Sequence, residues 1–347
     1  MCTCAVLSVA FLALKGSAKN WKLRGEIHRQ MAQVPEQRLN SLTRLTNAMS
    51  VDVEDFFQTE AMAKTVPRSS WDGIPSRVQR NTEQLFELFD AHGVRATFFF
   101  LGWVAERFPG LVRAAKDLGH EIACHSYWHR PVYTLSPSEF REDTKRAKSV
   151  IEDAAGVQIY GYRAPSFSLV SGTEWAAEIL AETGFTYDSS VHPIMHDLYD
   201  NRNAPRHPHQ LGETLLLEIP ISTVRLGEKN MPFSGGGYFR IFPSAYVHWA
   251  MRRINRVEKR PAVFYIHPWE LDPGQPRLAT SRRSRFRHYT GIGKTAKNLG
   301  RLLKIFSFAP ICEAFSNEPG TLGFGTEHTG TRQIRDDARL PSVASQV

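Results

Sequence analysis

Polar clusters follow short apolar runs at four places in this sequence, and this repetition restricts the fold more than any other feature. The clusters lie in residues 47–55, 119–129, 158–167 and 262–269. Each apolar run has the length and composition of a buried strand. Catalytic groups at the carboxyl ends of several strands are typical of a (β/α) barrel. The pattern therefore predicts an α/β fold that gathers these side chains at one end of a barrel.

Helical periodicity fills the intervals between the strand-like runs. We expect helices over 77–92, 109–118, 136–155 and 173–183, and further strands over 95–101, 121–124 and 185–188. Ser136 followed by Glu139 is a capping box, which marks the start of the third helix. Alternation of strand and helix predicts a parallel sheet or barrel with helices outside.

The remainder of the chain is less regular. We expect a strand over 214–222, a glycine loop over 234–237, and helices over 242–259 and 294–306. Glycines in succession indicate a sharp turn or a close approach of the backbone to a ligand. Residues 1–45 form a predicted N-terminal extension or a misplaced start, 46–318 the catalytic domain, and 319–347 a polar tail expected to be disordered.

His125 and His129 are candidate metal ligands. Neutral imidazoles four residues apart can bind one Zn²⁺ or a related divalent ion. An isolated pair at this spacing is more often two unrelated histidines, so the interpretation depends on the other clusters.

Asp52, Glu54 and Asp55 place three carboxylates within four residues. Like charges this close raise the pKa of at least one of them, so one could bind a metal while another acts as a general base. A solvated acidic turn is the alternative explanation for the same residues.

Arg163 and His267 each follow a strand-like run. The guanidinium of Arg163 could hold a carboxylate in a bidentate fork, although a structural ion pair is the simpler explanation for an isolated arginine. His267 enters a loop directly after an apolar run, at the same relative position as the other clusters.

The chain is basic, with a net charge of +8 and a pI near 9.4. Between Met251 and Lys304 there are fourteen Lys and Arg residues against three Asp and Glu. This charge indicates an acidic partner: an anionic polysaccharide, a membrane surface or a nucleic acid. No nucleic-acid-binding motif accompanies it, so we rank a nucleic acid last among these partners.

The four cysteines, Cys2, Cys4, Cys124 and Cys312, have neither disulfide nor zinc-site spacing. A reducing compartment is the simpler explanation. Residues 4–14 have the length of a signal-peptide core, but no basic residue precedes them. We therefore expect a cytoplasmic or membrane-associated protein, with export less favoured.

Taken in order, the motifs of this chain resemble those of the polysaccharide deacetylase (NodB-homology) superfamily, carbohydrate esterase family four. The motifs are Ser50-Val-Asp-Val-Glu-Asp-Phe56, His125-Ser-Tyr-Trp-His129, Tyr162-Arg-Ala-Pro-Ser-Phe167, Gly235-Gly-Gly-Tyr-Phe-Arg240, Phe264-Tyr-Ile-His-Pro-Trp-Glu270 and Ser284-Arg-Phe-Arg-His-Tyr289. The last three resemble a subfamily associated with exosortase-linked exopolysaccharide clusters, whose specific part would span about 196–318.

The resemblance implies a distorted (β/α)₇ barrel and metal-dependent hydrolysis of N-acetyl groups on sugars. Its implied roles are Asp52 as base, His125, His129 and Glu54 as metal ligands with Asp55 as the alternative to Glu54, Arg163 positioning the base, His267 as acid, Asp188 orienting His267, and the backbone N–H of Ser166 binding the oxyanion. Trp128, Trp269 and Tyr238 are candidate sugar-stacking side chains.

The implied cofactor is a divalent metal, with Zn²⁺ first and Co²⁺ as an alternative, and the implied partner is an N-acetylated polysaccharide or oligosaccharide. Peripheral contact with a membrane surface is a further expectation. The competing functions are a related barrel amidohydrolase on peptidoglycan or a non-sugar C–N bond, and a non-catalytic carbohydrate-binding protein.

Overall fold

The structure is a computed structural model that describes residues 45–316. Outside these residues lie the expected N-terminal extension up to residue 44, with Cys2 and Cys4, and the expected tail over 319–347. Cys124 and Cys312 are both free thiols, as their spacing predicted.

Seven parallel strands form the central sheet. In spatial order they are β10 (Val263–Ile266), β1 (Thr46–Val53), β2 (Thr97–Phe100), β3 (Glu121–Cys124), β4 (Gly161–Tyr162), β5 (Tyr187–Asp188) and β7 (Leu217–Glu218). Ser222, just beyond β7, donates its backbone N–H to the carbonyl of Val263 in β10 at 3.3 Å, which brings the two ends of the sheet together. The predicted distorted (β/α)₇ barrel is confirmed.

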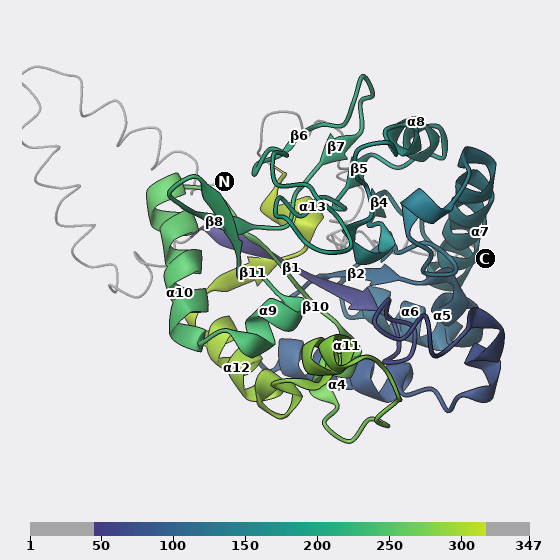
Figure 1. Cartoon of the computed structure of the whole chain (residues 1–347), viewed down its shortest axis with the longest axis horizontal. Helices are drawn as coiled ribbons and strands as arrows, with labels where there is room; N and C mark the ends of the chain where they lie inside the picture. The colour runs from purple at the N-terminus through teal and green to yellow at the C-terminus, as the bar shows by residue number, and fades with distance from the viewer. Residues whose placement is uncertain (1–44, 317–347) are drawn as a thin grey trace, which may run out of the picture. The chain divides into compact units, whose positions relative to one another are not determined.

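Helices cover the outside of this sheet (Figure 1). They are α4 (Val78–Asp90), α5 (Gly102–Arg107), α6 (Pro109–Asp117), α7 (Pro137–Ala155), α8 (Trp175–Glu182), α10 (Ser244–Arg253) and α12 (Ile292–Ile305). Figure 1 shows α10 and α12 along one side of the sheet and α5, α6 and α7 along the other. The expected helices are confirmed, and α7 starts at the predicted capping box of Ser136 and Glu139.

Shorter elements complete the body. They are η2 (Arg68–Gly73), η3 (Val132–Thr134), η4 (Pro165–Phe167), β6 (His209–Gln210), β8 (Thr223–Leu226), β9 (Lys229–Pro232), α9 (Gly236–Ile241), η5 (Ile254–Glu258), η6 (Pro268–Leu271), α11 (Arg282–Tyr289), β11 (Ser307–Ala309) and α13 (Ile311–Ala314). At one place α13 contacts the barrel strands directly, because the N–H of Ile311 donates to Oγ1 of Thr97 at 2.7 Å.

Alternation along β1 explains how the barrel places charge next to its core. Val51 and Val53 join the hydrophobic cluster that includes the outer helices. Successive side chains of a strand point to opposite faces, so Asp52 points the other way, toward the barrel interior. There Asp52 is 2% exposed, which requires a compensating partner.

Three expectations for the second half were inaccurate. The strand expected over 214–222 is two residues long, and the glycine loop over 234–237 leads into α9. The helix expected over 242–259 starts at Ser244, since Pro243 holds the preceding residue in an extended conformation. The helix α11 was not predicted, because charge dominates its sequence and it shows no amphipathic period.

Candidate active site

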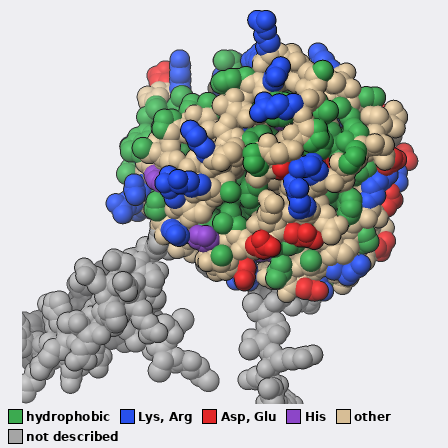
Figure 2. Space-filling view, turned by 90° about the horizontal axis from the view of Figure 1, so that it is seen from below, with side chains coloured by type: hydrophobic (Ala, Val, Ile, Leu, Met, Phe, Trp, Pro, Cys, Tyr) green, Lys and Arg blue, Asp and Glu red, His purple; other side chains and the backbone are tan. Residues whose placement is uncertain are grey.

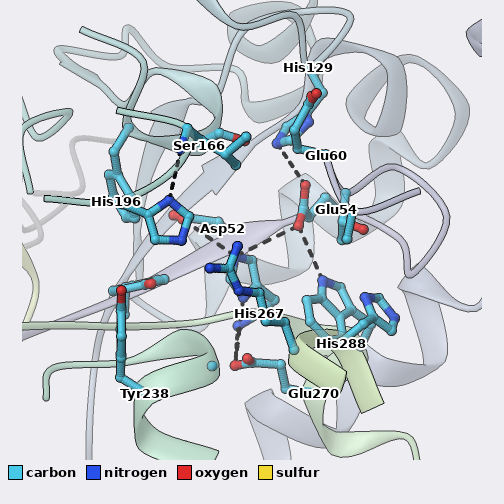
Figure 3. A pocket seen from close by; sticks show the side chains of 18 of the residues that line it. Asp52, Glu54, Glu60, His129, Ser166, His196, Tyr238, His267, Glu270 and His288 are labelled. Atoms are coloured by element: carbon cyan, nitrogen blue, oxygen red, sulfur yellow. Dashed lines mark hydrogen bonds and ion pairs between the residues drawn. The ribbon is translucent and has the colours of Figure 1, made fainter. Parts of the chain in front are cut away.

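The carboxyl ends of β1, β3 and β10 open into one pocket of about 270 Å³ (Figure 3). Asp52 and Glu54 reach it from β1, His125 and His129 from the segment after β3, and His267 from the end of β10. Side chains from α9 and α11 complete its wall. The barrel thus brings together the clusters that are separated along the sequence.

Glu54, His125 and His129 form a group whose ligand atoms all lie within 4.8 Å of one another. Oε2 of Glu54 lies 2.8 Å from Nε2 of His129, yet this oxygen has no hydrogen-bond partner among the described residues. A carboxylate oxygen and an imidazole nitrogen this close to each other and to the His125 ring are placed to bind the same cation. Two imidazoles and one carboxylate are a donor set that Zn²⁺ accepts in open catalytic sites.

The tautomer of His125 also suits a metal. Its Nδ1 lies 2.8 Å from the carbonyl oxygen of Arg163, which requires a proton on Nδ1 and leaves the lone pair on Nε2. Burial lowers the pKa of His125 to about 4, so the ring is neutral at pH 7. Burial by itself would raise the pKa of Glu54, but the neighbouring imidazoles, His129 foremost, lower it to about 2.

Asp55 faces away from this group. Its carboxylate accepts hydrogen bonds from the backbone N–H groups of Phe56, Arg77 and Val78 and from the Ser76 hydroxyl, at 2.7–3.1 Å. Asp55 therefore ties the turn after β1 to the start of α4. The geometry favours Glu54 over Asp55 as the third ligand.

Asp52 and Arg163 form a buried ion pair beside the proposed ligands. Nη1 of Arg163 donates to Oδ1 of Asp52 at 2.7 Å, and the guanidinium is fully buried. The remaining donors of Arg163 bond to Ser50 and Ser189, and its plane lies 4.1 Å from the ring of Phe99. A charge-assisted bond this well supported fixes the position of the Asp52 carboxylate.

His267 approaches Asp52 from the opposite side of the pocket. Its Nε2 lies 3.9 Å from Oδ2 of Asp52 and 3.7 Å from Oε1 of Glu54. Its Nδ1 lies 3.6 Å from Oε2 of Glu270, an ion-pair separation rather than a hydrogen bond. Burial alone would lower the pKa of His267, but its acidic neighbours, Glu270 foremost, raise it to about 9. The imidazole is therefore protonated at neutral pH and can act as an acid.

The carboxylate beside His267 is Glu270, not Asp188 as predicted. Asp188 accepts a hydrogen bond from Oγ of Ser190 at 2.5 Å, and Ser190 in turn accepts from the backbone N–H of Ala164 at 2.7 Å. The carboxyl of Asp188 also lies opposite that of Glu218 on the neighbouring strand, where burial raises both pKa values. Asp188 thus supports the loop after β4 and contacts Ser190 and Glu218.

The aromatic side chains behave differently from the prediction. Trp269 is almost fully buried between the rings of His267 and His288, whose centroids lie 5.1 and 4.2 Å away, and its Nε1 donates to Glu54. Neither face of Trp269 is free to stack on a sugar. Trp128 packs against Trp71 and is not among the residues that line the pocket. Tyr238 does line the pocket and stays a candidate for sugar stacking.

Ser166 lies in the pocket wall in a left-handed conformation with φ 55° and ψ 25°. His129 has φ 51°. Phe167, which also lines the pocket, has φ 53°. This backbone region costs a non-glycine residue roughly 1–2 kcal/mol, so its presence at three residues around one pocket is consistent with a functional constraint. The role of the Ser166 N–H as an oxyanion donor stays a prediction.

Two residues of the site had no predicted role. Arg240 lies 2.8 Å from Glu270, is 8% exposed, and its other nitrogens donate to the carbonyl oxygens of Arg287, His288 and Thr290. The sequence did contain a signal for Glu270. It follows His267 by three residues in a turn that begins at Pro268, and a glutamate at this spacing folds back onto the residue that caps the turn, here His267.

Comparison with known proteins identifies the class of hydrolase. Residues 63–187 match the family model described as polysaccharide deacetylase, and residues 189–316 match one described as a domain of unknown function (DUF3473). The chain therefore contains a deacetylase domain. Residues 63–187 are thus identified as a polysaccharide deacetylase domain.

Two curated relatives are similar over part of this region. The bifunctional xylanase/deacetylase of Pseudobutyrivibrio xylanivorans is 32% identical over 25% of this chain and 15% of its own length. The peptidoglycan-N-acetylglucosamine deacetylase of Bacillus cereus is 30% identical over 28% of this chain and 36% of its own length. The chain thus covers well under half of each.

A solved structure also aligns with the chain. A family 4 carbohydrate esterase from Streptomyces lividans in complex with acetate is 17% identical, with 74% of this chain and 89% of that chain covered and a TM-score of 0.40.

Proposed function

We propose that this protein is a divalent-metal-dependent hydrolase that removes N-acetyl groups from amino sugars of an exopolysaccharide or its precursor. The observation that carries the proposal is the meeting of Asp52, His267 and the Glu54–His125–His129 group in one pocket. Amide hydrolysis needs an activated water, a stabilised oxyanion and a protonated leaving amine, and this set of side chains can supply all three.

Glu54, His125 and His129 would hold the metal, with Zn²⁺ first and Co²⁺ as an alternative. A divalent ion at this place polarises the carbonyl oxygen and acidifies the attacking water. Trp269 holds Oε1 of Glu54 at 3.2 Å and leaves Oε2 directed at His129. The carbonyl of Arg163 orients His125.

Asp52 would accept the proton of the attacking water. Arg163 engages Oδ1 and leaves Oδ2 on the side of His267. Since Arg163 is itself held by serines and a phenylalanine ring, the carboxylate cannot rotate away from the pocket without breaking a buried ion pair.

His267 would donate a proton to the departing sugar nitrogen. Glu270 keeps its imidazole protonated, and Arg240 keeps Glu270 ionised, because Arg240 outweighs the effect of burial and lowers the pKa of that carboxyl. The backbone N–H of Ser166, in the facing wall, is the proposed oxyanion donor.

The test is acetate release from N-acetylglucosamine oligomers by the full chain, after EDTA treatment and after addition of Zn²⁺ or Co²⁺. Metal-dependent acetate that disappears in Asp52→Asn, with metal content retained, would support both the activity and the base. Metal-loaded, folded protein that releases no acetate from these oligomers or from N-acetylated exopolysaccharide would contradict it.

Peptidoglycan is the second candidate substrate, because the Bacillus cereus relative carries that activity in its name. Acetate release from peptidoglycan but not from exopolysaccharide would favour it. Release of ammonia from small ureides, with no release of acetate from glycans, would indicate hydrolysis of a non-sugar C–N bond. Glycan binding without any turnover would indicate a non-catalytic carbohydrate-binding protein.

We further propose a cytoplasmic location with peripheral contact to an anionic membrane surface. No helix within residues 45–316 is long and apolar enough to cross a membrane. The exposed cations on α10, η5 and α12 are Arg252, Arg253, Arg256, Lys294, Lys297, Arg301 and Lys304. Figure 2 shows Lys and Arg side chains spread over the face that it presents, including the left, the side on which Figure 1 draws α10 and α12.

Such clusters attract anionic lipids with roughly 1 kcal/mol per cation near the surface. Co-sedimentation with phosphatidylserine vesicles at low salt, lost at high salt, is the expected result. Equal binding to neutral phosphatidylcholine vesicles, or no binding to either, would contradict the proposal.

A further inference from the structure

The helix α11 is the most basic element at the pocket, and the catalytic proposal gives it no role. It carries Arg282, Arg283, Arg285 and Arg287 within six residues. Among the described residues, the carboxylate that pairs with them is Asp197, which lies 2.7 Å from Arg287 and 3.5 Å from Arg283. One acid against four arginines leaves a positive surface.

The C-terminal end of α11 is part of the pocket wall. Arg287 and His288 both line the pocket, and Figure 3 shows His288 near Glu54 and Glu270. The ring of His288 stacks on Trp269 with an interplanar angle of 7°. Arg287 is therefore at the pocket, and the other three arginines precede it on the same helix.

Arg240 fixes α11 to the catalytic histidine. Its Nη1 donates to the carbonyl oxygen of His288 and its Nη2 to that of Arg287, at the end of the helix, each at 2.8 Å. Its Nε donates to Glu270, which lies beside His267. Because these contacts are buried, the distance between the positive surface and the catalytic acid is held constant.

The outward side of α11 is available to a ligand. Arg282, Arg283 and Arg285 are exposed, Arg283 to 67%, and no ion pair or side-chain hydrogen bond engages Arg282 or Arg285 within residues 45–316. Phe286 is 57% exposed between them. Residues 282, 285 and 286 lie on one face of a helix, so an apolar ring is bordered by two guanidinium groups.

We propose that the substrate glycan is anionic and that α11 binds acidic sugar units next to the N-acetylated unit in the pocket. This inference rests on the proposed deacetylase function. Guanidinium groups bind carboxylates through paired hydrogen bonds, and an exposed ring gives the apolar face of a sugar a surface to cover. A glycan fits better than a membrane at this helix, because the same helix forms the wall of the pocket that receives the acetamide.

The experiment compares two N-acetylated oligosaccharides of equal length. A hyaluronan hexasaccharide alternates N-acetylglucosamine with glucuronate, and chitohexaose is neutral. We expect a higher kcat/KM for the hyaluronan oligomer, with the preference declining as salt rises. The double variant Arg282→Gln/Arg285→Gln should lower the ratio of the two kcat/KM values about tenfold, chiefly through the KM of the anionic oligomer.

Arg113→Gln is the matched control, because Arg113 is exposed on α6 and does not line the pocket. It should leave the ratio unchanged. An unchanged ratio in the double variant, or a wild-type preference for chitohexaose at low salt, would overturn the inference.

A binding measurement tests this inference separately from the deacetylase proposal, because binding does not require turnover. The affinity of the full-length, metal-free protein for the hyaluronan hexasaccharide can be measured by calorimetry without turnover. Salt-sensitive binding that the double variant weakens supports the inference even if neither oligomer releases acetate. Binding of phosphatidylserine vesicles through these arginines, with no affinity for hyaluronan, would contradict it.

Discussion

Nε of Arg240 donates to Oε1 of Glu270 at 2.8 Å, and Oε2 of the same carboxylate faces Nδ1 of His267. The three side chains come from α9, η6 and the end of β10, and Arg240 also holds the end of α11. A single buried arginine thus connects the proposed catalytic acid with the wall of the pocket. The first two of the following predictions concern this arrangement and the ion pair opposite it.

Glu270→Gln should lower the pKa of His267, because the neutral amide removes the largest of the contacts that raise it to about 9. The protonated acid form exists below that pKa, so the alkaline limit of activity should move to lower pH. Turnover at pH 8 should fall by about tenfold. The pH profile of acetate release checks this, and Glu258→Gln, whose carboxylate pairs with Arg206 and Arg260 away from the pocket, is the control. A profile that falls in height without shifting would mean a structural role only.

Arg163→Lys should destabilise the fold and abolish most turnover. Lysine cannot reproduce the donors that engage Ser50, Asp52 and Ser189, so a carboxylate would stay buried with a poor partner. A broken buried pair costs about 3–5 kcal/mol, against about 0.5 kcal/mol for an exposed one. Denaturant unfolding measures the difference, with Arg141→Lys at the exposed pair with Glu182 as control. Equal losses in the two variants would contradict the prediction.

Glu54→Gln and Asp55→Asn should separate metal binding from stability. Glu54→Gln should lose bound zinc, since its carboxylate completes the ligand group. Asp55→Asn should keep zinc but lose about 1–2 kcal/mol of stability, because it weakens the hydrogen bonds at the start of α4. Elemental analysis and thermal unfolding read out the two properties. Loss of zinc in Asp55→Asn alone would reassign the third ligand.

His120 should make the protein acid-sensitive. Its ring packs on Phe86 and Phe98, and burial first, then Arg95, lowers its pKa to about 4. In the unfolded chain the His120 ring binds a proton near pH 6.5, whereas in the folded protein it does so only near pH 4. The free energy of unfolding is therefore highest above pH 6.5 and decreases as the pH falls toward 4. This group alone accounts for about 3 kcal/mol over that window.

His120→Asn removes the titration and keeps an acceptor near the backbone N–H of Ala96, which bonds to Nδ1 at 3.3 Å. The free energy of unfolding should then change less between pH 7 and pH 4. The exposed His207→Asn should behave like the wild type. Identical pH slopes for all three proteins would rule out this role of His120.

Gly235→Ala should prevent or severely impair folding. The residue has φ 141°, and an added Cβ would lie 2.0 Å from the carbonyl oxygen of Tyr265. At Gly237 the nearest atom to an added Cβ is 3.8 Å away, so Gly237→Ala should be tolerated. Soluble yield and melting temperature compare the two variants. A Gly235→Ala protein as stable as Gly237→Ala would show that the backbone can shift at this contact.

The glycine triplet also shows the limit of a local prediction. Its sequence indicates a close approach of the backbone, and the structure has one, but the neighbour is the strand β10 rather than a ligand. The neighbour, Tyr265, follows Gly235 by about thirty residues in the sequence. Identifying it therefore requires knowledge of where the later strand lies.

The sequence by itself determined the α/β alternation and the positions at which strands deliver Asp52, His125, Arg163 and His267, because hydrophobic periodicity and strand ends are local properties. Only the tertiary structure distinguishes Glu54 from Asp55, which are adjacent in the sequence and point to different neighbours, and its geometry favours Glu54 as the ligand.

The tertiary structure likewise placed Glu270 rather than Asp188 at His267, enclosed Trp269 between two histidine rings, and attached α11 to the pocket through Arg240. Each of these outcomes depends on which distant segments pack together. The burial and direction of a side chain follow from such contacts, and residue type and spacing alone do not specify them.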